Sequence, residues 1–284
     1  MRSFYLGPDG LAAVMAIVNR TPDSFYDQGA TELFDAALAR VEAVVDQGAG
    51  IIDIGGVKAG PGTHVGPSEE IDRVVPLIAE VRQRYPHLHI SVDTWRAAVA
   101  EEAINAGANL VNDTWAGHDP ELVEVAGAHK VGYVCSHTGG VQPRTRPYRV
   151  HFDDVVSDVI RETTALAQRA VECGVPEDQV LIDPTHDFGK NTYHGLELLR
   201  RIDELVVTGW PVLMALSNKD FVGETLDRPV GERVPGTLAC TSFSAARGVA
   251  VFRAHEVAAT LDTIRMTAAI QGTCSPRAVT RGLA

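Results

Sequence analysis

The sequence predicts a single (β/α)₈ TIM barrel of the α/β class over residues 1–284, and three features indicate it. The chain length of 284 residues is usual for such a barrel. Eight short apolar runs follow one another along the chain, with helical segments between them. The runs lack strict alternation of polar and apolar residues, as expected of parallel strands buried on both faces. Strands alternating with helices in this way favour a closed barrel over an open sheet.

The apolar runs define the eight predicted strands. In order along the chain they are Ala12–Val18, Ile51–Ile54, Leu88–Val92, Leu110–Val111, Val131–Cys135, Val180–Ile182, Pro211–Ala215 and Val249–Phe252. An amphipathic helix that contains Phe34 and Leu38 is expected to end at Gly48. Ser68 is the expected N-cap of the next helix, in which Pro76 would introduce a kink. Further helices are predicted over Trp95–Ala106, Asp153–Cys173, Leu196–Val206, Thr237–Arg247 and His255–Ala269.

Composition and charge exclude several classes of protein. The net charge of −12 argues against nucleic acid and anionic membranes as partners. The four cysteines form no CxxC spacing, so we expect reduced thiols rather than a zinc or redox motif. No signal peptide, bilayer-spanning run or glycine-rich dinucleotide fingerprint is visible. We therefore expect a cytoplasmic protein of one domain, whose last residues, Gly272–Ala284, form a frayed tail.

Polar residues stand at or just beyond the end of every predicted strand. In a barrel of this kind the active site lies at the carboxyl ends of the strands, so these residues should meet at one mouth. They are Asn19, Asp53, Asp93, Asn112, Asp113, His137, Asp183, Ser217, Lys219, Arg253 and His255.

This set of side chains suits a flat, nitrogen-rich ring that carries a phosphate group. Carboxylates such as Asp93 and Asp183 can accept two parallel hydrogen bonds from an amino-amide edge like that of a pterin. Lys219 can donate to a ring carbonyl or nitrogen. Arg253 and His255, with the N-terminus of the last helix, are expected to form an anion site suited to phosphate.

Structural roles compete with these functional ones. We interpret Asp53 as a buried structural carboxylate beneath the mouth, and Asp113 as a possible turn cap. His137 could equally be a core histidine with both nitrogens satisfied. Asp93, Asp183 and Lys219 could form a salt-bridge cluster between strands.

Several segments in order along the chain resemble dihydropteroate synthase. The similarity extends from Val14 to about Val257. The segments that carry it are Met15-Ala-Ile-Val-Asn-Arg-Thr-Pro-Asp-Ser-Phe, Ile51-Ile-Asp-Ile-Gly-Gly, Ser91-Val-Asp-Thr, Val111-Asn-Asp, Asp183-Pro, Phe188 with Lys190, Ser217-Asn-Lys and Arg253-Ala-His.

The resemblance implies an activity and a role for each matching residue. The family joins a dihydropterin diphosphate to 4-aminobenzoate through a carbocation-like pterin, releases diphosphate with Mg²⁺ present, and commonly forms homodimers. By resemblance the pterin is held by Asp93, Asn112, Asp183, Lys219 and Arg253, of which Asp93 and Lys219 are catalytic. The diphosphate is held by Asn19, Arg253 and His255, with Asn19 also a ligand of the metal. The aminobenzoate side is bordered by Pro61, Phe188 and Ser217.

The sequence departs from the family pattern after the second strand. The family has Gly-Gly-Glu-Ser-Thr-Arg-Pro-Gly, whereas this chain has Val57, Ala59 and Gly60 in place of the acid, the threonine and the arginine. The family's arginine binds the diphosphate, and losing such a contact costs roughly 1.5–3 kcal/mol, about ten- to a hundred-fold in binding.

Further departures follow the sixth and seventh strands. Thr185 and Asp187 replace family glycines, which would strain the backbone if either position needs a positive φ. Asp187 also brings a carboxylate near the aminobenzoate side. Asn218 replaces an arginine beside the lysine, and Arg20 stands where a small aliphatic residue is usual.

These losses fall on the second-substrate and diphosphate side, while the pterin side is intact. We therefore predict a pterin-binding protein with weak or absent synthase activity, for which 4-aminobenzoate is a poor ligand and Mg²⁺ is dispensable if the protein is inactive. Two alternatives stay open. The protein could be an active synthase in which Arg20 and Lys58 restore the positive charge, or another pterin-dependent transferase of the same barrel class.

Overall fold

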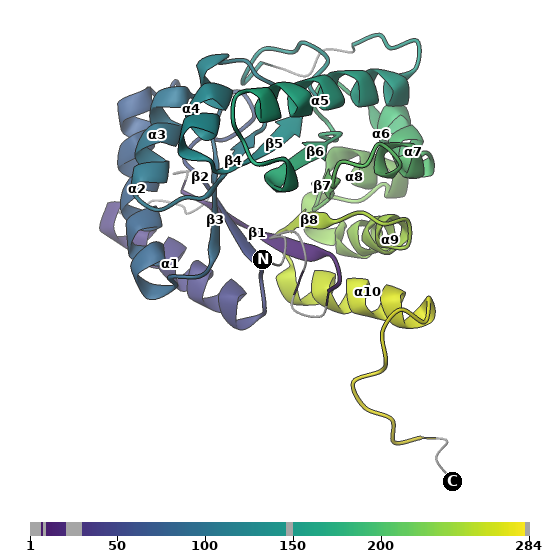
Figure 1. The fold of residues 1–284 in the computed structure, drawn as a ribbon. Coiled ribbons are helices and arrows are strands. Elements are labelled where there is room, and N and C mark those ends of the chain that lie inside the picture. The colour runs from purple at the N-terminus through teal and green to yellow at the C-terminus, as the bar shows by residue number, and fades with distance from the viewer. Residues whose placement is uncertain (1–6, 8–9, 21–29, 146–149, 282–284) are drawn as a thin grey trace.

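The computed structural model describes residue 7 and residues 10–20, 30–145 and 150–281 of the chain. All eight predicted strands are present, and helices lie between them (Figure 1). The strands are β1 (Ala13–Asn19), β2 (Ile51–Gly55), β3 (His89–Asp93), β4 (Leu110–Asp113), β5 (Gly132–Ser136), β6 (Val180–Asp183), β7 (Leu213–Met214) and β8 (Val251–Ala254). The segment of the first family motif beyond Arg20 lies outside the described residues.

The strands form one parallel sheet that closes on itself. Their order is β6-β5-β4-β3-β2-β1-β8-β7, and every pair is parallel. Closure comes from an isolated parallel bridge between Ile182 and Val212, where the Ile182 N–H donates to the Pro211 carbonyl at 3.0 Å. The predicted (β/α)₈ barrel is therefore confirmed, with β6 and β7 as its most weakly joined pair.

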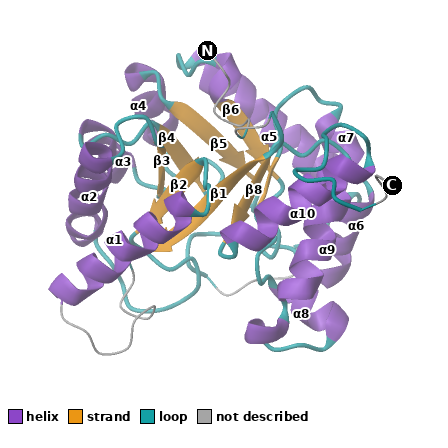
Figure 2. Cartoon of the chain, turned by 90° about the horizontal axis from the view of Figure 1, so that it is seen from below, coloured by secondary structure: helices purple, strands orange, loops and turns teal. Residues whose placement is uncertain are grey.

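Helices surround the strands on the outside, in order around the barrel (Figure 1), and Figure 2 shows them flanking the strands in a view turned by 90°. They are α1 (Ala30–Asp46), α2 (Pro67–Arg84), α3 (Ala97–Asn105), α4 (Glu121–His129), α5 (Val155–Glu172), α6 (Thr192–Arg200), α7 (Ile202–Val206), α8 (Asp220–Leu226), α9 (Val234–Ala245) and α10 (Val257–Ile270). Two short 3₁₀ helices, Glu177–Gln179 and Val230–Glu232, join them. The sequence did not predict α4 or α8, and the single helix expected over Leu196–Val206 is divided into α6 and α7.

Two helix boundaries test the expected capping residues. Gly48 has φ +101° just after α1, and the Ala49 N–H returns to the Val44 carbonyl at 3.0 Å, so the predicted stop is confirmed. Ser68 as an N-cap is wrong. Gly66 is the cap of α2 and Pro67 fills the first turn, because proline has the φ of a helix and no N–H to leave unpaired.

The apolar core has two parts, and the smaller one supports the mouth. It fills the barrel with Ala13, Met15, Ile51, Leu110, Val134, Leu181, Leu213, Ala215 and Val251. The larger part lies between the strands and the helices. Among the described residues, no helix is long and apolar enough to cross a membrane. Beyond α10 the described chain runs away from the barrel, with residues 275–281 exposed (Figure 1).

Candidate active site

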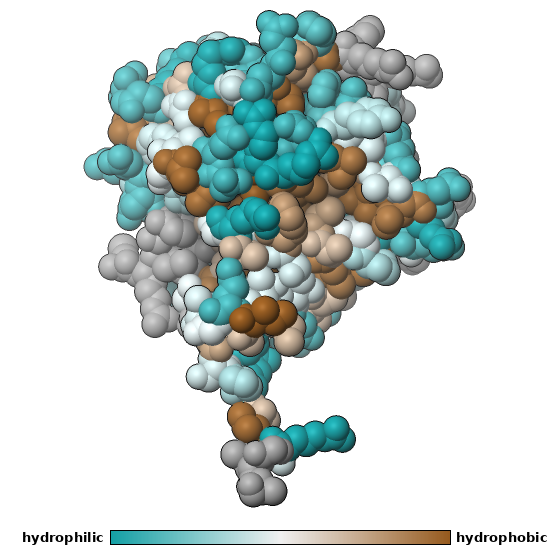
Figure 3. Space-filling view, turned by 90° about the vertical axis from the view of Figure 1, so that its right-hand side faces the viewer, coloured by the Kyte–Doolittle hydropathy of each residue, from teal (hydrophilic) through white to brown (hydrophobic). Residues whose placement is uncertain are grey.

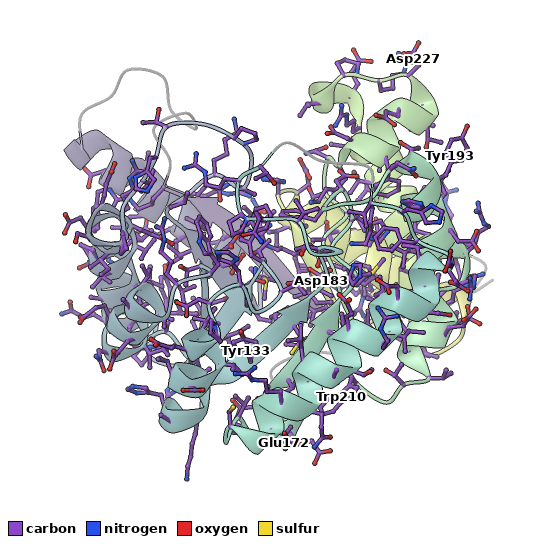
Figure 4. All side chains as sticks on the ribbon, turned by 90° about the horizontal axis from the view of Figure 1, so that it is seen from above. Tyr133, Glu172, Asp183, Tyr193, Trp210 and Asp227 are labelled. Carbon is purple, nitrogen blue, oxygen red and sulfur yellow. The ribbon has the colours of Figure 1, made fainter. Side chains whose placement is uncertain are left out.

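Strand register places the predicted polar residues in one row. Asn19 pairs with Gly55, Gly55 with Asp93, and Asp93 with Asn112 across β1 to β4. On the other side Ser136 of β5 pairs with Asp183 at the end of β6. In Figure 4 Asp183 lies between the end of the barrel marked by Trp210 and Glu172 and the end marked by Tyr193 and Asp227. The carboxyl ends of the strands thus form the mouth that the sequence predicted.

Arg253 joins two strand-end carboxylates beneath this mouth. Its Nε lies 2.6 Å from Asp53 Oδ2, and its Nη2 lies 2.7 Å from Asp93 Oδ2. Asp53 is fully buried and also accepts from Ser91 Oγ at 2.6 Å and Asn112 Nδ2 at 3.1 Å. All of its bonds are internal, so the structural interpretation of Asp53 is confirmed.

Asp93 and Asp183 are the carboxylates with perturbed acidity at the mouth. Burial raises the pKa of Asp93 to about 6, against the opposing effect of Arg253. Burial also raises the pKa of Asp183 to about 6, although the Thr185 N–H donates to its Oδ1 at 2.7 Å and Lys219 lies near. Such carboxyl groups exchange protons near neutral pH, as expected of a site that binds or transforms a ligand.

Two lysines, Lys219 and Lys190, lie near Asp183 and interact with it electrostatically. Lys219 Nζ donates to the His186 carbonyl at 3.1 Å and lies 4.9 Å from the centre of the Phe188 ring, and burial lowers its pKa. Lys190 Nζ donates to three main-chain carbonyls at 2.8–3.2 Å, and burial lowers its pKa to about 7. The sequence matched Lys190 to the family motif without giving it a role. Its contacts make it the residue that holds the loop after β6.

A cavity of about 320 Å³ opens beside Arg253 and is called the anion cavity here. Its polar and charged lining comprises Asn19, Lys58, Asp93, Ser217, Lys219, Arg253 and His255. Lys58 therefore faces the place where the family arginine is missing. Arg20 does not, because its Nη1 donates to the Arg73 carbonyl of α2 at 2.6 Å.

His255 and the start of α10 differ from the expected phosphate site. Burial and the neighbouring Arg253 lower the pKa of His255, so the ring adds no positive charge at neutral pH. The N-cap of α10 is Glu256, whose carboxylate accepts from Ser217 Oγ at 3.0 Å and Asn218 Nδ2 at 3.1 Å. This carboxylate beside the N-terminus of α10 opposes the binding of an anion there, and the predicted diphosphate site of Asn19, Arg253 and His255 stays a prediction.

A second cavity of about 290 Å³ adjoins the first and is called the aromatic cavity. Pro61, Trp115 and Phe188 give it flat apolar walls, and the Trp115 and Phe188 rings meet edge to face at 5.0 Å. Lys219 lines both cavities. Ser217, predicted on the aminobenzoate side, lies on the wall of the anion cavity. Trp115 was not foreseen, because it falls in the turn after β4 rather than at a strand end.

The loop after β6 has left-handed backbone where the family has glycines. Thr185 has φ +51° and Asp187 has φ +70°, so both residues have the positive φ that strains a residue other than glycine. Such residues cost about 1–3 kcal/mol each, less for aspartate than for β-branched threonine. Position 189 in the same loop requires glycine, because a Cβ there would lie 2.2 Å from the Thr138 carbonyl oxygen. The loop is therefore strained but fixed.

Two further polar residues have structural roles. Asp113 accepts from the Trp115 and Gly117 N–H groups at 3.1 and 2.6 Å and from the Tyr133 hydroxyl at 2.8 Å, which confirms it as a turn cap. His137 is buried, with Nε2 3.0 Å from Asp158 Oδ2 of α5, and burial lowers its pKa to about 4. The neutral ring thus points outward to the helix layer, but its buried Nδ1 has no hydrogen-bond partner among the described residues, so the expectation of two satisfied nitrogens is wrong.

The residues near Asn19 fit Mg²⁺ only together with a diphosphate. Asn19 offers one amide oxygen in a cavity that also holds Lys58, Lys219 and Arg253. Mg²⁺ requires six oxygen ligands and is commonly bound through substrate phosphates. Among the described residues of this cavity, the protein alone supplies too few oxygen ligands for the ion.

This barrel, with two carboxylates, an amide and a lysine converging at its mouth, has the architecture of a pterin-binding barrel protein. The sequence profile of the family described as pterin binding enzyme matches residues 15–255, and the chain belongs to this family.

Within that family the similarity is to dihydropteroate synthases, as the motifs predicted. A Mycobacterium leprae protein named inactive dihydropteroate synthase 2 is 60% identical over 95% of this chain and 94% of its own length. The Bacillus subtilis dihydropteroate synthase is 39% identical over 86% of this chain and 83% of its own. A solved structure of Xanthomonas albilineans dihydropteroate synthase with 4-aminobenzoic acid has a TM-score of 0.85 at 36% identity, covering 93% of this chain and 94% of that one.

Proposed function

We propose that this protein binds a pterin at the barrel mouth and has weak or absent dihydropteroate synthase activity. The observation that carries the proposal is the contrast between the intact row Asp93, Asn112 and Asp183 and the altered loops around it. The high identity to the Mycobacterium leprae protein named inactive supports the same conclusion.

In the proposed complex each mouth residue has a defined task. Asp183 accepts from the amino-amide edge of the ring, and the Asn112 amide oxygen is directed by the bond from its Nδ2 to Asp53. Lys219 donates to the ring carbonyl or nitrogen. Asp93 lies where it would stabilise positive charge on the pterin. With a diphosphate bound, Asn19 would hold Mg²⁺, which neutralises the leaving group.

Calorimetry with three ligands tests the proposal. The bare dihydropterin should bind, its diphosphate should gain little additional affinity, and 4-aminobenzoate should bind weakly or not at all. Release of diphosphate from the dihydropterin diphosphate, measured with 4-aminobenzoate present, should be far slower than for the Bacillus subtilis enzyme. Turnover comparable to that enzyme would refute the impairment, and failure of the bare pterin to bind would refute the proposal as a whole.

A second candidate function is an active synthase with a rearranged anion site. The position of Lys58 in the anion cavity favours it, because a lysine can replace part of the missing arginine's charge. A strong gain of affinity from the diphosphate group would support this second candidate.

We also propose a homodimer formed through α9 and α10. These adjacent helices expose Phe243, Met266 and Ile270, the last two at 61% and 73%. Apolar surface on this side of the molecule is visible among hydrophilic patches in Figure 3. Light scattering after size exclusion should give the mass of a dimer, and Ile270→Glu should give a monomer. The four free cysteines are compatible with the cytoplasm that we propose as its location.

A further inference from the structure

We propose that Asp187 makes the aromatic cavity selective for uncharged aromatic amines and against those that carry a carboxylate. The proposal deepens the proposed function and rests on it in taking the aromatic cavity as the place of a second ligand. Asp187 would be a specificity-determining residue whose own carboxylate stands where that of an acidic ligand would have to bind.

The contacts of Asp187 carry the argument. Its Oδ2 accepts from the Asp220 N–H at 2.6 Å, and its Oδ1 approaches the Phe221 N–H at 3.4 Å, both at the start of α8. The residue lines the aromatic cavity together with Lys219 and Phe188. A carboxylate supplied by the chain itself is thus bonded to main-chain donors at the wall of the second cavity.

Other donors at this wall have internal partners as well. Lys219 Nζ donates to the His186 carbonyl at 3.1 Å and attracts Asp187 electrostatically. Asn218, which replaces a family arginine, donates its Nδ2 to Glu256. Asp187 and Asp220 both line the cavity, and the charge of Asp220 is offset by Arg233, whose Nη1 lies 2.8 Å from its Oδ1. An incoming carboxylate would have to displace Asp187 and would be repelled by its like charge.

The backbone indicates why this arrangement persists. Asp187 has φ +70°, a conformation that glycine, its counterpart in the family pattern, adopts without cost. The aspartate tolerates this φ and offsets the strain with its bonds to the start of α8. Glycine at this position would leave the same N–H groups directed at the cavity with no internal acceptor.

The remaining walls define what the cavity can take. Pro61, Trp115 and Phe188 suit a flat ring, and the acidic rim tolerates a neutral amide better than an acid. The ligand class that these walls and Asp187 select is a flat aromatic amine with an uncharged polar group in place of the carboxylate. 4-Aminobenzamide has this chemistry: it has nearly the shape of 4-aminobenzoate, but it is uncharged and has an N–H₂ donor in place of one carboxylate oxygen.

Competitive calorimetry with 4-aminobenzoate and 4-aminobenzamide tests the proposal in the full-length protein, with and without saturating dihydropterin. The dissociation constant of the amide should be at least about ten-fold lower than that of the acid, as expected for one unfavourable charge contact. Asp187→Gly should raise the affinity for the acid by about ten- to a hundred-fold and reverse the order. Asp187→Asn, which keeps an acceptor and tolerates the same φ, should remove the preference for the amide without reversing it.

Asp227→Gly is the matched control. Asp227 also has a positive φ, +51°, and follows the other end of α8, where it is exposed (Figure 4). The variant makes the same chemical change at the same kind of backbone position, and the ratio of the two affinities should not move. Three results would overturn the proposal. The unaltered protein could bind the acid as tightly as the amide or more tightly, it could bind neither ligand, or the ratio of the two affinities could be unchanged in both Asp187 variants. Loss of dihydropterin binding alone would instead count against the proposed function, since the ratio is also measured without pterin.

Discussion

The pterin side of the mouth is built from strand ends, whereas the aromatic cavity and the 57–59 wall of the anion cavity are built largely from loops. Asp93, Asn112 and Asp183 are fixed by a ladder of parallel strands, and Asp93 is also held by the partly buried Arg253. Lys58 and Asp187 belong to loops whose sequence departs from the family pattern. The difference shows that the strand-end residues of a binding site can be retained because the fold requires them, while the residues on its loops change.

The largest expected effect tests whether the pterin side is indeed fixed by the fold. Arg253→Met should lower the free energy of unfolding by about 3–5 kcal/mol, because Asp53 would be left buried without its cation. Urea denaturation measures the change. Arg161→Met, which removes an exposed ion-paired arginine of α5, should leave the free energy of unfolding almost unchanged. Similar losses in the two variants would contradict the comparison.

The next effect concerns pterin binding itself. Asp183→Asn should weaken binding of the dihydropterin by about ten- to a hundred-fold, because an amide cannot accept two parallel hydrogen bonds with the strength of a carboxylate. Calorimetry gives the affinity, with Asp153→Asn, an exposed position, as the control. If the Asp183 variant kept the original affinity, the pterin would have to bind at a place other than Asp183.

The acidity of the same carboxylates predicts a pH profile. The pKa of Asp183 is raised to about 6, so the carboxylate is ionised above that pH and protonated below it. Because the ligand edge donates, affinity for the dihydropterin should be constant above about pH 7. Below about pH 6 the affinity should fall, by up to ten-fold per pH unit from the protonation of Asp183 alone. Binding titrations from pH 5 to 8 measure this dependence. An affinity that rises as the pH falls would contradict the prediction.

A smaller effect is expected from restoring charge on the loop side. Gly60 does not have a positive φ, and the nearest side-chain atom to a Cβ there is Lys58 Cε at 4.0 Å, so Gly60→Arg fits without strain. It should raise affinity for inorganic diphosphate by about ten-fold. Gly231→Arg, at an open exposed site, serves as the control. An equal gain in both variants would indicate an effect of net charge only.

The smallest effect concerns Lys58. This side chain is exposed at the rim of the anion cavity, and exposed charge contacts contribute about 0.2–1 kcal/mol. Lys58→Met should therefore weaken diphosphate binding by about two- to five-fold, whereas Lys130→Met should leave it unchanged. A hundred-fold loss in the Lys58 variant would favour the active synthase with a rearranged anion site.

The sequence predicted the fold and one half of the site more fully than the other half. All eight strands were visible as apolar runs, and their polar ends identified Asp93, Asn112 and Asp183. Helix α8 was missed because it has 7 residues, too few turns for a clear periodicity. Helix α4 was missed although it has 9 residues, as many as the predicted α3. Trp115 and the contacts of Lys190 were missed because they lie in turns that carry no periodic signal.

The sequence by itself determined the barrel and the meeting of its strand-end residues, because parallel strands linked by helices bring their carboxyl ends to one edge whatever the loops do. Tertiary structure alone decided that Arg20 bonds to α2 while Lys58 faces the cavity, that Glu256 stands at the start of α10, and that Asp187 bonds to α8. Each of these outcomes depends on which partner a side chain finds across the fold. That choice is fixed by loop backbone angles and local burial, which short-range sequence patterns do not encode.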